Sequence, residues 1–453
     1  MIKKSIKIVA LLLWSATITF ENAIAQIDTL RLMAYNVLYY GDNPPCQGPH
    51  DIYHNYLKSI IAYSKPDIIG LEKMAAIPMF PGDNSGTAPT GFADSVLQFA
   101  FNAAIPATYN YCNYTNTSGA DNINLLYYNK AKLGFAGILS SYSNITDFDT
   151  YKLYYKDVAL ATTHDTLFLY VTLNHDQSGS TTGNATTRGA QIGGYMDQLQ
   201  SHYTRLNNLI TMGDFNTHNS SEPCYQRLVA PSDTNYLFYD PPFYPDALFT
   251  YPADWDNNPS TYATCLTTST RLSGSLPNSC GTSGGGKSWY DHIFLASSII
   301  HNTDRIKYIP YSYSTLGNDG NRVGISINDA PTNTSAPSDV INSLFQMSNK
   351  YPIIADLVIG PHTASVIEQE LTKINLSVIN PVHDKLIVYL SGFSNAKTIS
   401  VECFDLIGQS KMKCDLQFYG EKSITPIDLP SGNYLLRFTE GKQLLKNIIV
   451  SKD

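Results

Sequence analysis

Acidic, amide and imidazole side chains stand at the ends of several predicted strands of this sequence. The tetrapeptide G-D-F-N, residues 213–216, directly follows an apolar strand. Side chains at a strand end point into a cleft, where groups of these types can hold a cation or move a proton. Each residue also fits an ordinary role as a turn amide, a solvated loop histidine or a cap. The candidates are Asn36, His175, Asp214, Asn216 and Asp291.

The elements that position these residues alternate between strand-like and amphipathic helical runs. Strands are predicted at residues 30–36, 67–71, 123–128, 209–212, 290–295 and 352–359, with two antiparallel strands in 158–173 that turn at 164–165. Helices are predicted at residues 54–63, 92–103 and 187–203. Mixed hairpins and crossover helices predict an α/β sandwich rather than a doubly wound parallel sheet.

The rest of the chain contains two long loops and, after residue 373, a change to a pattern of short strands. Residues 231–288 are rich in Pro, Tyr, Asn and Gly, and residues 309–340 in Ser, Asn and Pro. Loops this long inside a compact domain more often serve function than not. A polar connector, residues 361–373, precedes residues 374–453, where short alternating strands separated by Gly-containing turns predict a small β-sandwich.

The first 25 residues have the pattern of a cleavable secretory signal. Three lysines precede an apolar run, and Ala23-Ile24-Ala25 forms a small-x-small site before Gln26. No later run approaches the roughly 20 apolar residues of a membrane-spanning helix. The sequence therefore predicts an exported protein without a transmembrane segment.

Seven cysteines are an odd number for a compartment that permits disulfides. Spacing suggests two pairs, Cys265 with Cys280 and Cys403 with Cys414. The chain has 30 Lys and Arg against 38 Asp and Glu and no basic run. This balance is the opposite of the positive charge expected of a protein that binds a nucleic-acid duplex tightly, so a polyanionic ligand would have to bind through local groups.

The order of the motifs resembles the endonuclease/exonuclease/phosphatase superfamily, which has the deoxyribonuclease I-like fold. The matching features are a strand ending in Asn36, P-D-I-I-G-L, His175 with Arg188 and Gln191 downstream, G-D-F-N, Y-D-H-I-F-L and S-x-x-Y-P-I. The resemblance covers about residues 28–359. It implies a four-layer α/β sandwich with mixed sheets over residues 26–360 and cleavage of phosphoesters with Mg²⁺ or Mn²⁺.

Roles for the site residues follow from the same resemblance. Asn36 would bind phosphate or, together with Asp214, a metal ion if a divalent ion binds. His175 would contact the phosphoryl group, Asp214 would orient the attacking water, and Asn216 would bind a phosphate oxygen. Asp291 would orient a second histidine near the last strand.

Three positions depart from the family pattern. Ser348-Asn349-Lys350 stands where the family has S-D-H, and Glu72-Lys73 where it has Q-E. An ammonium group repels Mg²⁺ and cannot ligate it. Strand alternation predicts that Glu72 points away from the site, and that His292 lies on the opposite face from Asp291.

One hypothesis explains the departures by charge. The ammonium groups of Lys73 and Lys350 would replace the metal and the imidazole and balance Asp214 and Asp291, giving a metal-independent phosphate site to which Asn349 also contributes. The alternative is loss of the site, with both lysines in solvent. Three substitutions together argue against efficient turnover.

The tail resembles the C-terminal sorting module of type IX secretion substrates. The matching residues are N-P-x-x-D-x-L from Asn380, D-x-x-G from Asp405 and L-x-x-G-x-Y from Leu429. The alternative is a generic adhesive or carbohydrate-binding β-sandwich. The resemblance implies export by the type IX machinery and a secreted or cell-surface location.

Two classes of function stay open. One is a secreted phosphodiesterase or nuclease with a remodelled metal site. The other is a binding protein, without efficient catalysis, for a phosphorylated ligand such as a nucleic acid, a nucleotide or a headgroup, and in either case a monomer is expected. Dependence on divalent metal would separate the two classes.

Overall fold

The computed structural model describes residues 28–41, 50–76, 91–158, 160–163, 165–245, 247–273, 281–360, 375–391, 397–405, 409–441 and 443–453. These residues form two compact units, which divide after residue 362. The predicted signal, residues 1–25, and the predicted connector, residues 361–373, lie outside the described residues.

Two sheets of mixed strand direction form the centre of the first unit. The first sheet has the order β11-β13-β1-β2-β4-β3 with β12 paired to β13, and the second has the order β5-β6-β7-β8-β10-β9. The pairs β1–β2 and β7–β8 are parallel, whereas β1–β13 and β8–β10 are antiparallel. The strands are β1 (Asp28–Tyr40), β2 (Ile68–Ala75), β3 (Tyr109–Tyr111), β4 (Asn122–Asn129), β5 (Leu133–Asn144), β6 (Thr146–Tyr155), β7 (Phe168–His175), β8 (Leu209–Asp214), β9 (Phe238–Tyr239), β10 (Asp291–Ala296), β11 (Ile306–Tyr308), β12 (Ser314–Thr315) and β13 (Ile353–Ile359).

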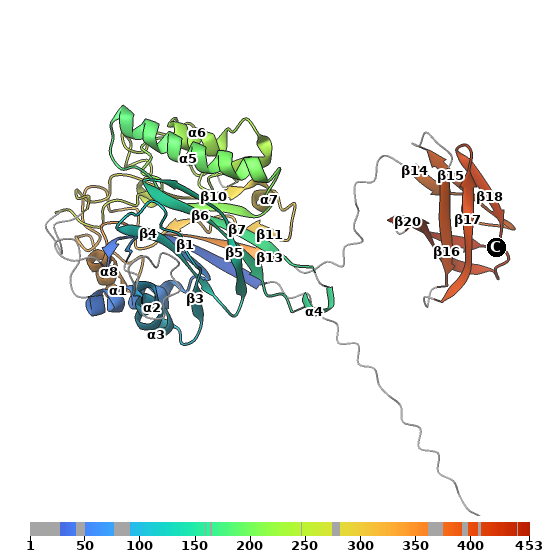
Figure 1. Cartoon of the computed structure of the whole chain (residues 1–453), viewed down its shortest axis with the longest axis horizontal. Coiled ribbons are helices and arrows are strands. Elements are labelled where there is room, and N and C mark those ends of the chain that lie inside the picture. The colour runs from blue at the N-terminus through green and yellow to red at the C-terminus, as the bar shows by residue number, and fades with distance from the viewer. Residues whose placement is uncertain are drawn as a thin grey trace, which may run out of the picture. The chain divides into compact units, whose positions relative to one another are not determined.

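Helices cover the outer face of each sheet (Figure 1). Helices α1 (His50–Ser64) and α8 (Ser338–Met347) pack on the first sheet, and α5 (Thr182–His202) and α6 (Pro223–Val229) on the second. This order of helix, sheet, sheet and helix confirms the predicted four-layer α/β sandwich. The other helical segments are α2 (Phe92–Val96), a π-helical turn (Leu97–Phe101), α3 (Asn102–Ala104), α4 (Leu160–Thr163), α7 (Ser297–Ile300) and two 3-10 turns (Thr234–Tyr236 and Ala263–Cys265).

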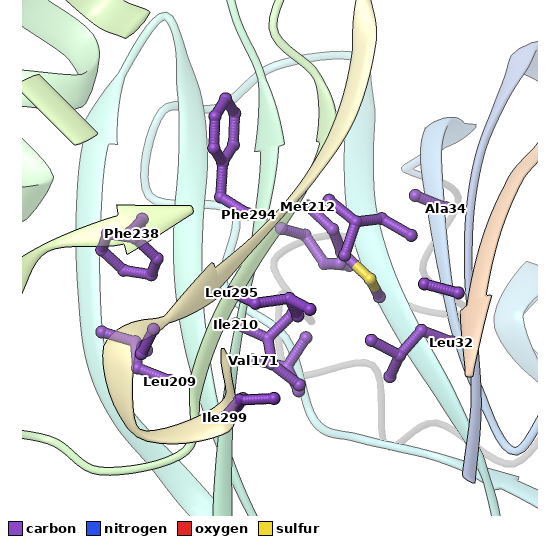
Figure 2. Close-up of a cluster of buried hydrophobic side chains, with 14 of the residues drawn as sticks. Leu32, Ala34, Val171, Leu209, Ile210, Met212, Phe238, Phe294, Leu295 and Ile299 are labelled. Atoms are coloured by element: carbon purple, nitrogen blue, oxygen red, sulfur yellow. The ribbon is translucent and has the colours of Figure 1, made fainter. Parts of the chain in front are cut away.

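Two apolar clusters hold the four layers together. In one cluster, Leu32 and Ala34 of the first sheet pack with Val171 and Met212 of the second (Figure 2). The other cluster joins α1 and α8 to the outer face of the first sheet. Strand β1 is buried on both faces for most of its length, which explains its nearly continuous apolar sequence. The strand ends that carry the candidate residues are therefore fixed by a packed core.

One predicted strand is wrong. Residues 158–163 were expected to pair with the strand that follows, but they contain the short helix α4, and Val158 is 84% exposed. The antiparallel partner of β7 is β6. The sequence pattern misses β5 and β6 because their Ser, Tyr, Asn and Asp residues hide the alternation of a strand.

The regular elements in the described part of the second unit are all strands, in two sheets with the orders β14-β15-β18 and β17-β16-β19-β20. Its apolar cluster includes Leu386, Val401 and Phe438. This arrangement confirms the predicted small β-sandwich. The strands are β14 (Asn375–Val378), β15 (Lys385–Ser391), β16 (Lys397–Phe404), β17 (Ser410–Phe418), β18 (Lys422–Pro426), β19 (Gly432–Glu440) and β20 (Gln443–Lys452). Across both units, no helix in the described ranges is long and apolar enough to cross a membrane.

The expected disulfide between Cys403 and Cys414 is wrong. Both thiols are free, because the register of β16 and β17 places Cys403 opposite Met412 and Cys414 opposite Val401. Cys280 lies outside the described residues, so its pairing with Cys265 stays a prediction.

Candidate functional site

Two rows of polar side chains come together where the strands of the two sheets end. In the second sheet, His175, Asp214 and Asp291 are direct neighbours across β7, β8 and β10. In the first sheet, Asn36 on β1 is the register partner of Glu72 on β2. The structure thus brings together the predicted residues of both sheets.

Asp214 is the centre of the site and is buried. Its Oδ2 accepts hydrogen bonds from Asn36 Nδ2 at 2.8 Å and pairs with Lys350 Nζ at 2.9 Å, while its Oδ1 accepts from the backbone N of Asn216 at 3.1 Å. Gly213 precedes it with a φ of 136°, and a Cβ there would lie 2.1 Å from the carbonyl oxygen of Asn174. The glycine of G-D-F-N is therefore required by the close approach of β7.

Lys350 is buried in the site, with only 4% of its surface exposed. Its ammonium group lies 2.9 Å from Asp214 Oδ2, 3.4 Å from Asp291 Oδ2 and 4.7 Å from the ring centroid of Tyr290. Lys350 thus pairs with the acid that was expected to orient a histidine. The alternative that placed this lysine in solvent is wrong.

Burial and charge act against each other on the three paired groups. For Lys350, burial lowers the pKa, but Asp214 and Asp291 outweigh it and raise that pKa above its usual value. For Asp214, burial is outweighed by Lys350, His175 and Lys73, so its pKa is lowered. For Asp291, burial prevails and raises the pKa to about 7. Lys350 and Asp214 therefore form an ion pair at neutral pH.

Glu72 faces the site, contrary to the alternation argument. It is fully buried, and neither carboxylate oxygen has a hydrogen-bond partner among the described residues. Burial, followed by Asp291 and Asp214, raises the pKa of Glu72 well above its usual range. The prediction had placed Lys73 at the family's acidic position, but Ile68 of β2 packs between the sheets and Leu71 packs on the outer face, so regular alternation directs Glu72 inward. The left-handed residue of this strand, Lys73 with a φ of 56°, comes after Glu72.

Lys73 lies at the edge of the site rather than at its centre. Its ammonium group sits 4.7 Å from the ring centroid of Tyr39, and the side chain is partly exposed. It still acts electrostatically on His175 and Asp214. The hypothesis that this ammonium takes the place of a metal ion stays a prediction, and the β2 residue buried beside Asn36 is Glu72.

Two more predicted residues lie beside Asp214, and a third is directed elsewhere. His175 is half-buried, and burial, followed by Lys73, lowers its pKa to about 3, so the imidazole is neutral. Asn216 donates from Nδ2 to the backbone oxygen of Asp176 at 2.9 Å. Asn349 donates to the carbonyl oxygen of Thr282 at 3.3 Å and is thus turned toward the loop at residues 281–282.

His292 lies on the opposite face of β10 from Asp291, as predicted. It is buried, its Nδ1 lies 3.0 Å from Asp240 Oδ2, and its ring packs 4.5 Å from that of Trp289. It is a core histidine and takes no part in the site.

Sequence reasoning missed the segment that holds Asp291 and Lys350 in place. Residues 267–271, which we call the strap, are five consecutive polar residues that are all buried. Thr267 Oγ1 accepts from the backbone N of Asp291 at 3.2 Å. Thr270 Oγ1 donates to the backbone oxygen of Ser348 at 2.5 Å, and the backbone N of Thr270 donates to the backbone oxygen of Asn349 at 3.0 Å. Arg271 donates to the last carbonyl groups of α8. A Ser/Thr-rich loop gives no periodic signal that would reveal this burial.

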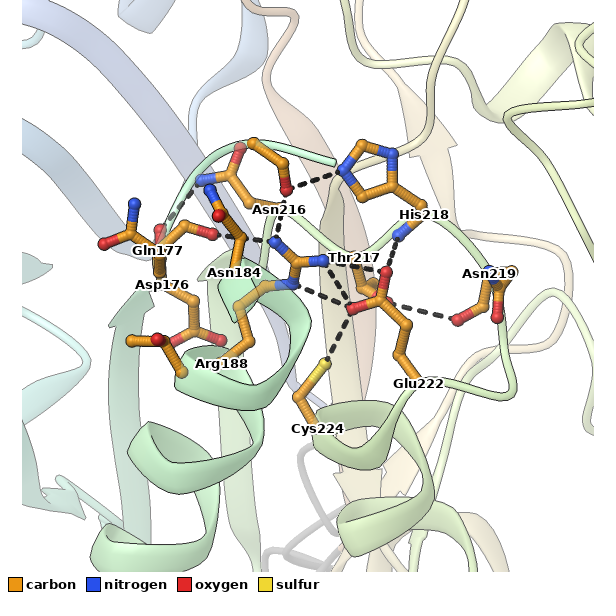
Figure 3. Close-up of polar contacts among 12 residues, drawn as sticks. Asp176, Gln177, Asn184, Arg188, Asn216, Thr217, His218, Asn219, Glu222 and Cys224 are labelled. Carbon is orange, nitrogen blue, oxygen red and sulfur yellow. Dashed lines mark hydrogen bonds and ion pairs between the residues drawn. The ribbon is translucent and has the colours of Figure 1, made fainter. Parts of the chain in front are cut away.

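A second polar network joins the two loops that follow β7 and β8 (Figure 3). Arg188 Nε and Nη2 donate to both oxygens of Glu222 at 2.8 Å, and Nη1 donates to the backbone oxygens of Gln177 and Gly179. Glu222 in turn accepts from the backbone N of His218 at 3.0 Å. Figure 3 shows the guanidinium group between the loops, so Arg188 fixes the loop that follows His175 to the loop that carries Asn216.

The residues present do not fit the divalent ion that the family resemblance implies. Among the described residues, no group of three or more His, Cys, Asp or Glu side chains could hold a metal ion. Both oxygens of Asp214 are already engaged, and the charge of Lys350 lies against it. Two features favour a cation: the carboxylates of Glu72 and Asp176 are buried, and among the described residues neither has a hydrogen-bond partner.

Comparison with known proteins gives distant structural similarities only. No family model matches the chain, and no curated protein matches it. Truncated TDP2 from Caenorhabditis elegans is 13% identical, with a TM-score of 0.41 over 73% of this chain and 98% of that one. An endonuclease/exonuclease/phosphatase family protein from Leptotrichia buccalis C-1013-b is 11% identical, with a TM-score of 0.40 over 72% and 98%. ANGEL2, a 2',3'-cyclic phosphatase, is 12% identical, with a TM-score of 0.40 over 73% and 95%. Identities this low transfer neither activity nor site residues to this chain.

Proposed function

We propose that this chain is a secreted or surface-delivered protein that binds a phosphate or phosphodiester group in the site around Asp214, with hydrolase activity weak or lost. The ligand class is a phosphorylated molecule such as a nucleic acid, a nucleotide or a headgroup. The observation that carries the proposal is the burial of the Lys350 ammonium between Asp214 and Asp291. A permanent cation there does the electrostatic work of an imidazolium but cannot exchange a proton near neutral pH.

The proposed roles follow from position. Asn36, Lys73 and Lys350 provide donors and positive charge to a phosphoryl group, and Asn349 contributes from the edge. His175 is neutral and donates one hydrogen bond, while Asn216 binds a phosphate oxygen. Asp214 would orient a water molecule for in-line attack, but its oxygens are held by Lys350 and Asn36, which lowers their basicity.

A second candidate is an active hydrolase that depends on a divalent metal. It is favoured by Glu72, whose buried carboxylate has no hydrogen-bond partner among the described residues. An ion bound by Glu72 with Asn36 and Asp214 would supply charge to the phosphoryl oxygens. It would also require Lys350 to leave Asp214, because an ammonium group and a divalent ion repel each other.

Hydrolysis of a chromogenic phosphodiester by the full chain separates the two candidates. We expect no turnover with Mg²⁺, Mn²⁺ or EDTA, and a gain of metal-dependent turnover in the variant Asn349→Asp, Lys350→His. Adding Lys73→Glu should change little, because Glu72 already faces the site. Turnover by the natural protein that EDTA abolishes would overturn the proposal in favour of the second candidate.

Delivery forms a separate part of the proposal. The signal-like residues 1–25 and the sorting-like residues 374–453 support export through the inner membrane and then by the type IX machinery, with release or surface attachment of a monomer. In a bacterium that has this machinery, deletion of residues 374–453 should leave the protein in the periplasm. Unchanged export of the truncated chain would contradict this part.

A further inference from the structure

The site contains two lysine–tyrosine pairs. From the first sheet, the Lys73 ammonium lies 4.7 Å from the Tyr39 ring centroid, and at the second sheet the Lys350 ammonium lies 4.7 Å from that of Tyr290. Both ammonium groups lower the pKa of Asp214, although burial alone would raise it. Each tyrosine ring is therefore next to a cation that acts on the centre of the site.

The backbone at the first pair is strained. Leu38, Tyr39 and Lys73 have φ values of 49°, 62° and 56°, in the left-handed region that side chains other than glycine rarely adopt. The register of β1 and β2 shifts between Asn36 and Tyr40, at the same place. Strain of this kind persists where the surrounding structure imposes it, and it gathers at functional sites. Here its effect is to turn Tyr39 and Lys73 toward each other at the rim.

The two rings are accessible, unlike their neighbours. Tyr39 and Tyr290 are partly exposed, whereas Tyr35 and Tyr40 on the same strand as Tyr39 are fully buried. Tyr290 meets the ring of His218 edge to face, with centroids 5.0 Å apart. Burial, followed by Asp256, raises the pKa of Tyr290 to about 12, so the ring stays a neutral phenol.

The charges of the two lysines differ in availability. Lys350 is balanced by Asp214 and Asp291, whereas Lys73 makes no ion pair among the described residues. An anionic group of a ligand thus has one open cation to meet, directly beside the Tyr39 ring.

We propose that the ligand of this site is a phosphate ester whose organic substituent is a planar π system, with the phosphate held at Lys73 and the planar group stacked on Tyr39 or Tyr290. This inference rests on the proposed phosphate-binding function and narrows its ligand class. An aromatic face beside a fixed cation favours a planar group over an aliphatic group of the same size. Both groups would gain the same free energy from buried apolar area, but only the planar group gains the additional free energy of stacking on the ring.

Calorimetric titration of the full chain in EDTA tests the inference with matched probes. Phenyl phosphate and cyclohexyl phosphate have similar size and charge, but one alone is planar, and inorganic phosphate reports the anion site. We expect phenyl phosphate to bind about fivefold more tightly than cyclohexyl phosphate. A similar preference for adenosine monophosphate over ribose 5-phosphate would identify the planar group as a nucleobase. If phenyl phosphate is preferred but adenosine monophosphate is not, the planar group is a small aryl group.

Variants then assign the effect to a ring. Tyr39→Leu or Tyr290→Leu should abolish the preference while leaving the affinity for inorganic phosphate within about twofold, and the corresponding Phe variants should restore it. The control is Tyr311→Leu, on a tyrosine that is 71% exposed in the same unit. Equal affinity for the planar and aliphatic esters, or a preference that survives in both Leu variants, overturns the inference and leaves the proposed function standing. No binding of any probe, inorganic phosphate included, overturns the proposed function and the inference with it.

Discussion

A lysine in the place where the family resemblance expects a histidine keeps its charge over a much wider range of pH. In this chain, that lysine is buried between two carboxylates, so its charge is part of the fold. The same charge that would hold a phosphoryl oxygen also stabilises the ends of β8 and β10. Function and stability at Lys350 are therefore coupled.

Replacement of Lys350 should destabilise the first unit strongly. Lys350→Met leaves the buried Asp214 and Asp291 uncompensated, and we expect a loss of about 3–5 kcal/mol in the free energy of unfolding. Denaturation followed by tryptophan fluorescence measures it, because Trp255 and Trp289 both lie in this unit. As a control, Lys73→Met should lose less than about 1 kcal/mol. Equal losses would show that Lys350 is not the buried partner of these acids.

Because folding raises the pKa of Glu72, this residue should make the protein less stable as the pH rises. A carboxyl group whose pKa is raised by folding contributes most below its unfolded pKa of about 4.3, and this contribution is lost as the pH rises through the folded pKa. Glu72→Gln should therefore melt at a higher temperature than the natural protein at pH 8, with a smaller difference at pH 5. Thermal melts at both values measure this.

The control for Glu72→Gln is Glu222→Gln. This variant weakens the paired hydrogen bonds to Arg188 and should lower the melting temperature at both pH values. Suppose instead that Glu72→Gln is destabilising at pH 8 and that Mg²⁺ stabilises only the natural protein. Glu72 would then hold a cation, and the second candidate function would gain support.

At the scale of elements, the site depends on segments outside the main strands. The strap pairs with residues 348–351 on one side and with residues 285–288 on the other. It therefore holds the start of β13, with Lys350, next to the start of β10, with Asp291. Part of the long predicted loop 231–288 thus has a defined structural role.

Removal of the Thr267 hydroxyl should cost more than its small size suggests. In Thr267→Val, the backbone N–H groups of Tyr290 and Asp291 lose a buried acceptor, and we expect a loss of about 1–3 kcal/mol together with weaker binding of inorganic phosphate. Denaturation and calorimetry measure the two effects. Thr186→Val, on the exposed face of α5, is the matched control and should change neither. Unchanged phosphate binding in Thr267→Val would mean that the strap does not position the site.

The contact between His218 and Asp256 should stabilise the loops that follow β7 and β8, and this stabilisation should depend on pH. Nδ1 of His218 contacts the Asp256 carboxylate and Nε2 lies 3.2 Å from the Gly179 oxygen, so both nitrogens face acceptors. Burial lowers the pKa of His218, but Asp256 outweighs it and, with Arg188 and Glu222 also acting, that pKa is raised.

The stabilisation is then complete below the unfolded pKa of about 6.5 and is lost as the pH rises through the folded pKa. The difference in melting temperature between the natural protein and Asp256→Asn should therefore shrink from pH 6 to pH 9. A difference that stays constant over this range would indicate a neutral His218.

At the scale of the whole molecule, the two units have separate apolar cores. The clusters of the first unit and that of the second share no residue. Because cooperative unfolding follows the packed core, each unit should unfold independently. Scanning calorimetry of the chain cut after residue 360 should reproduce the transition of the first unit within about 2 °C. A larger shift would show that the units stabilise each other.

Local pattern alone was enough for much of the fold and for half of the site. Apolar runs ending in Asn36 and Asp214, and a strand starting at Asp291, depend on strand periodicity and turn chemistry, which are properties of neighbouring residues. The opposite orientations of Asp291 and His292 follow from the same alternation and are confirmed. In the second unit, alternation predicted the β-sandwich, but not the register that separates Cys403 from Cys414.

Only the tertiary structure decided which residues fill the centre of the site. The family pattern assigned that place to Lys73, but Ile68 of the same strand packs between the sheets, so Glu72 on the same face points inward. Which face of β2 lies inside is set by packing against the second sheet. The burial of Lys350 and of the strap likewise depends on segments far apart in the chain, such as Thr270 with Ser348. The hydrophobic periodicity of a strand is a property of neighbouring residues and can be seen in the sequence. The energy of a buried charge depends instead on the partners that the complete fold brings to it.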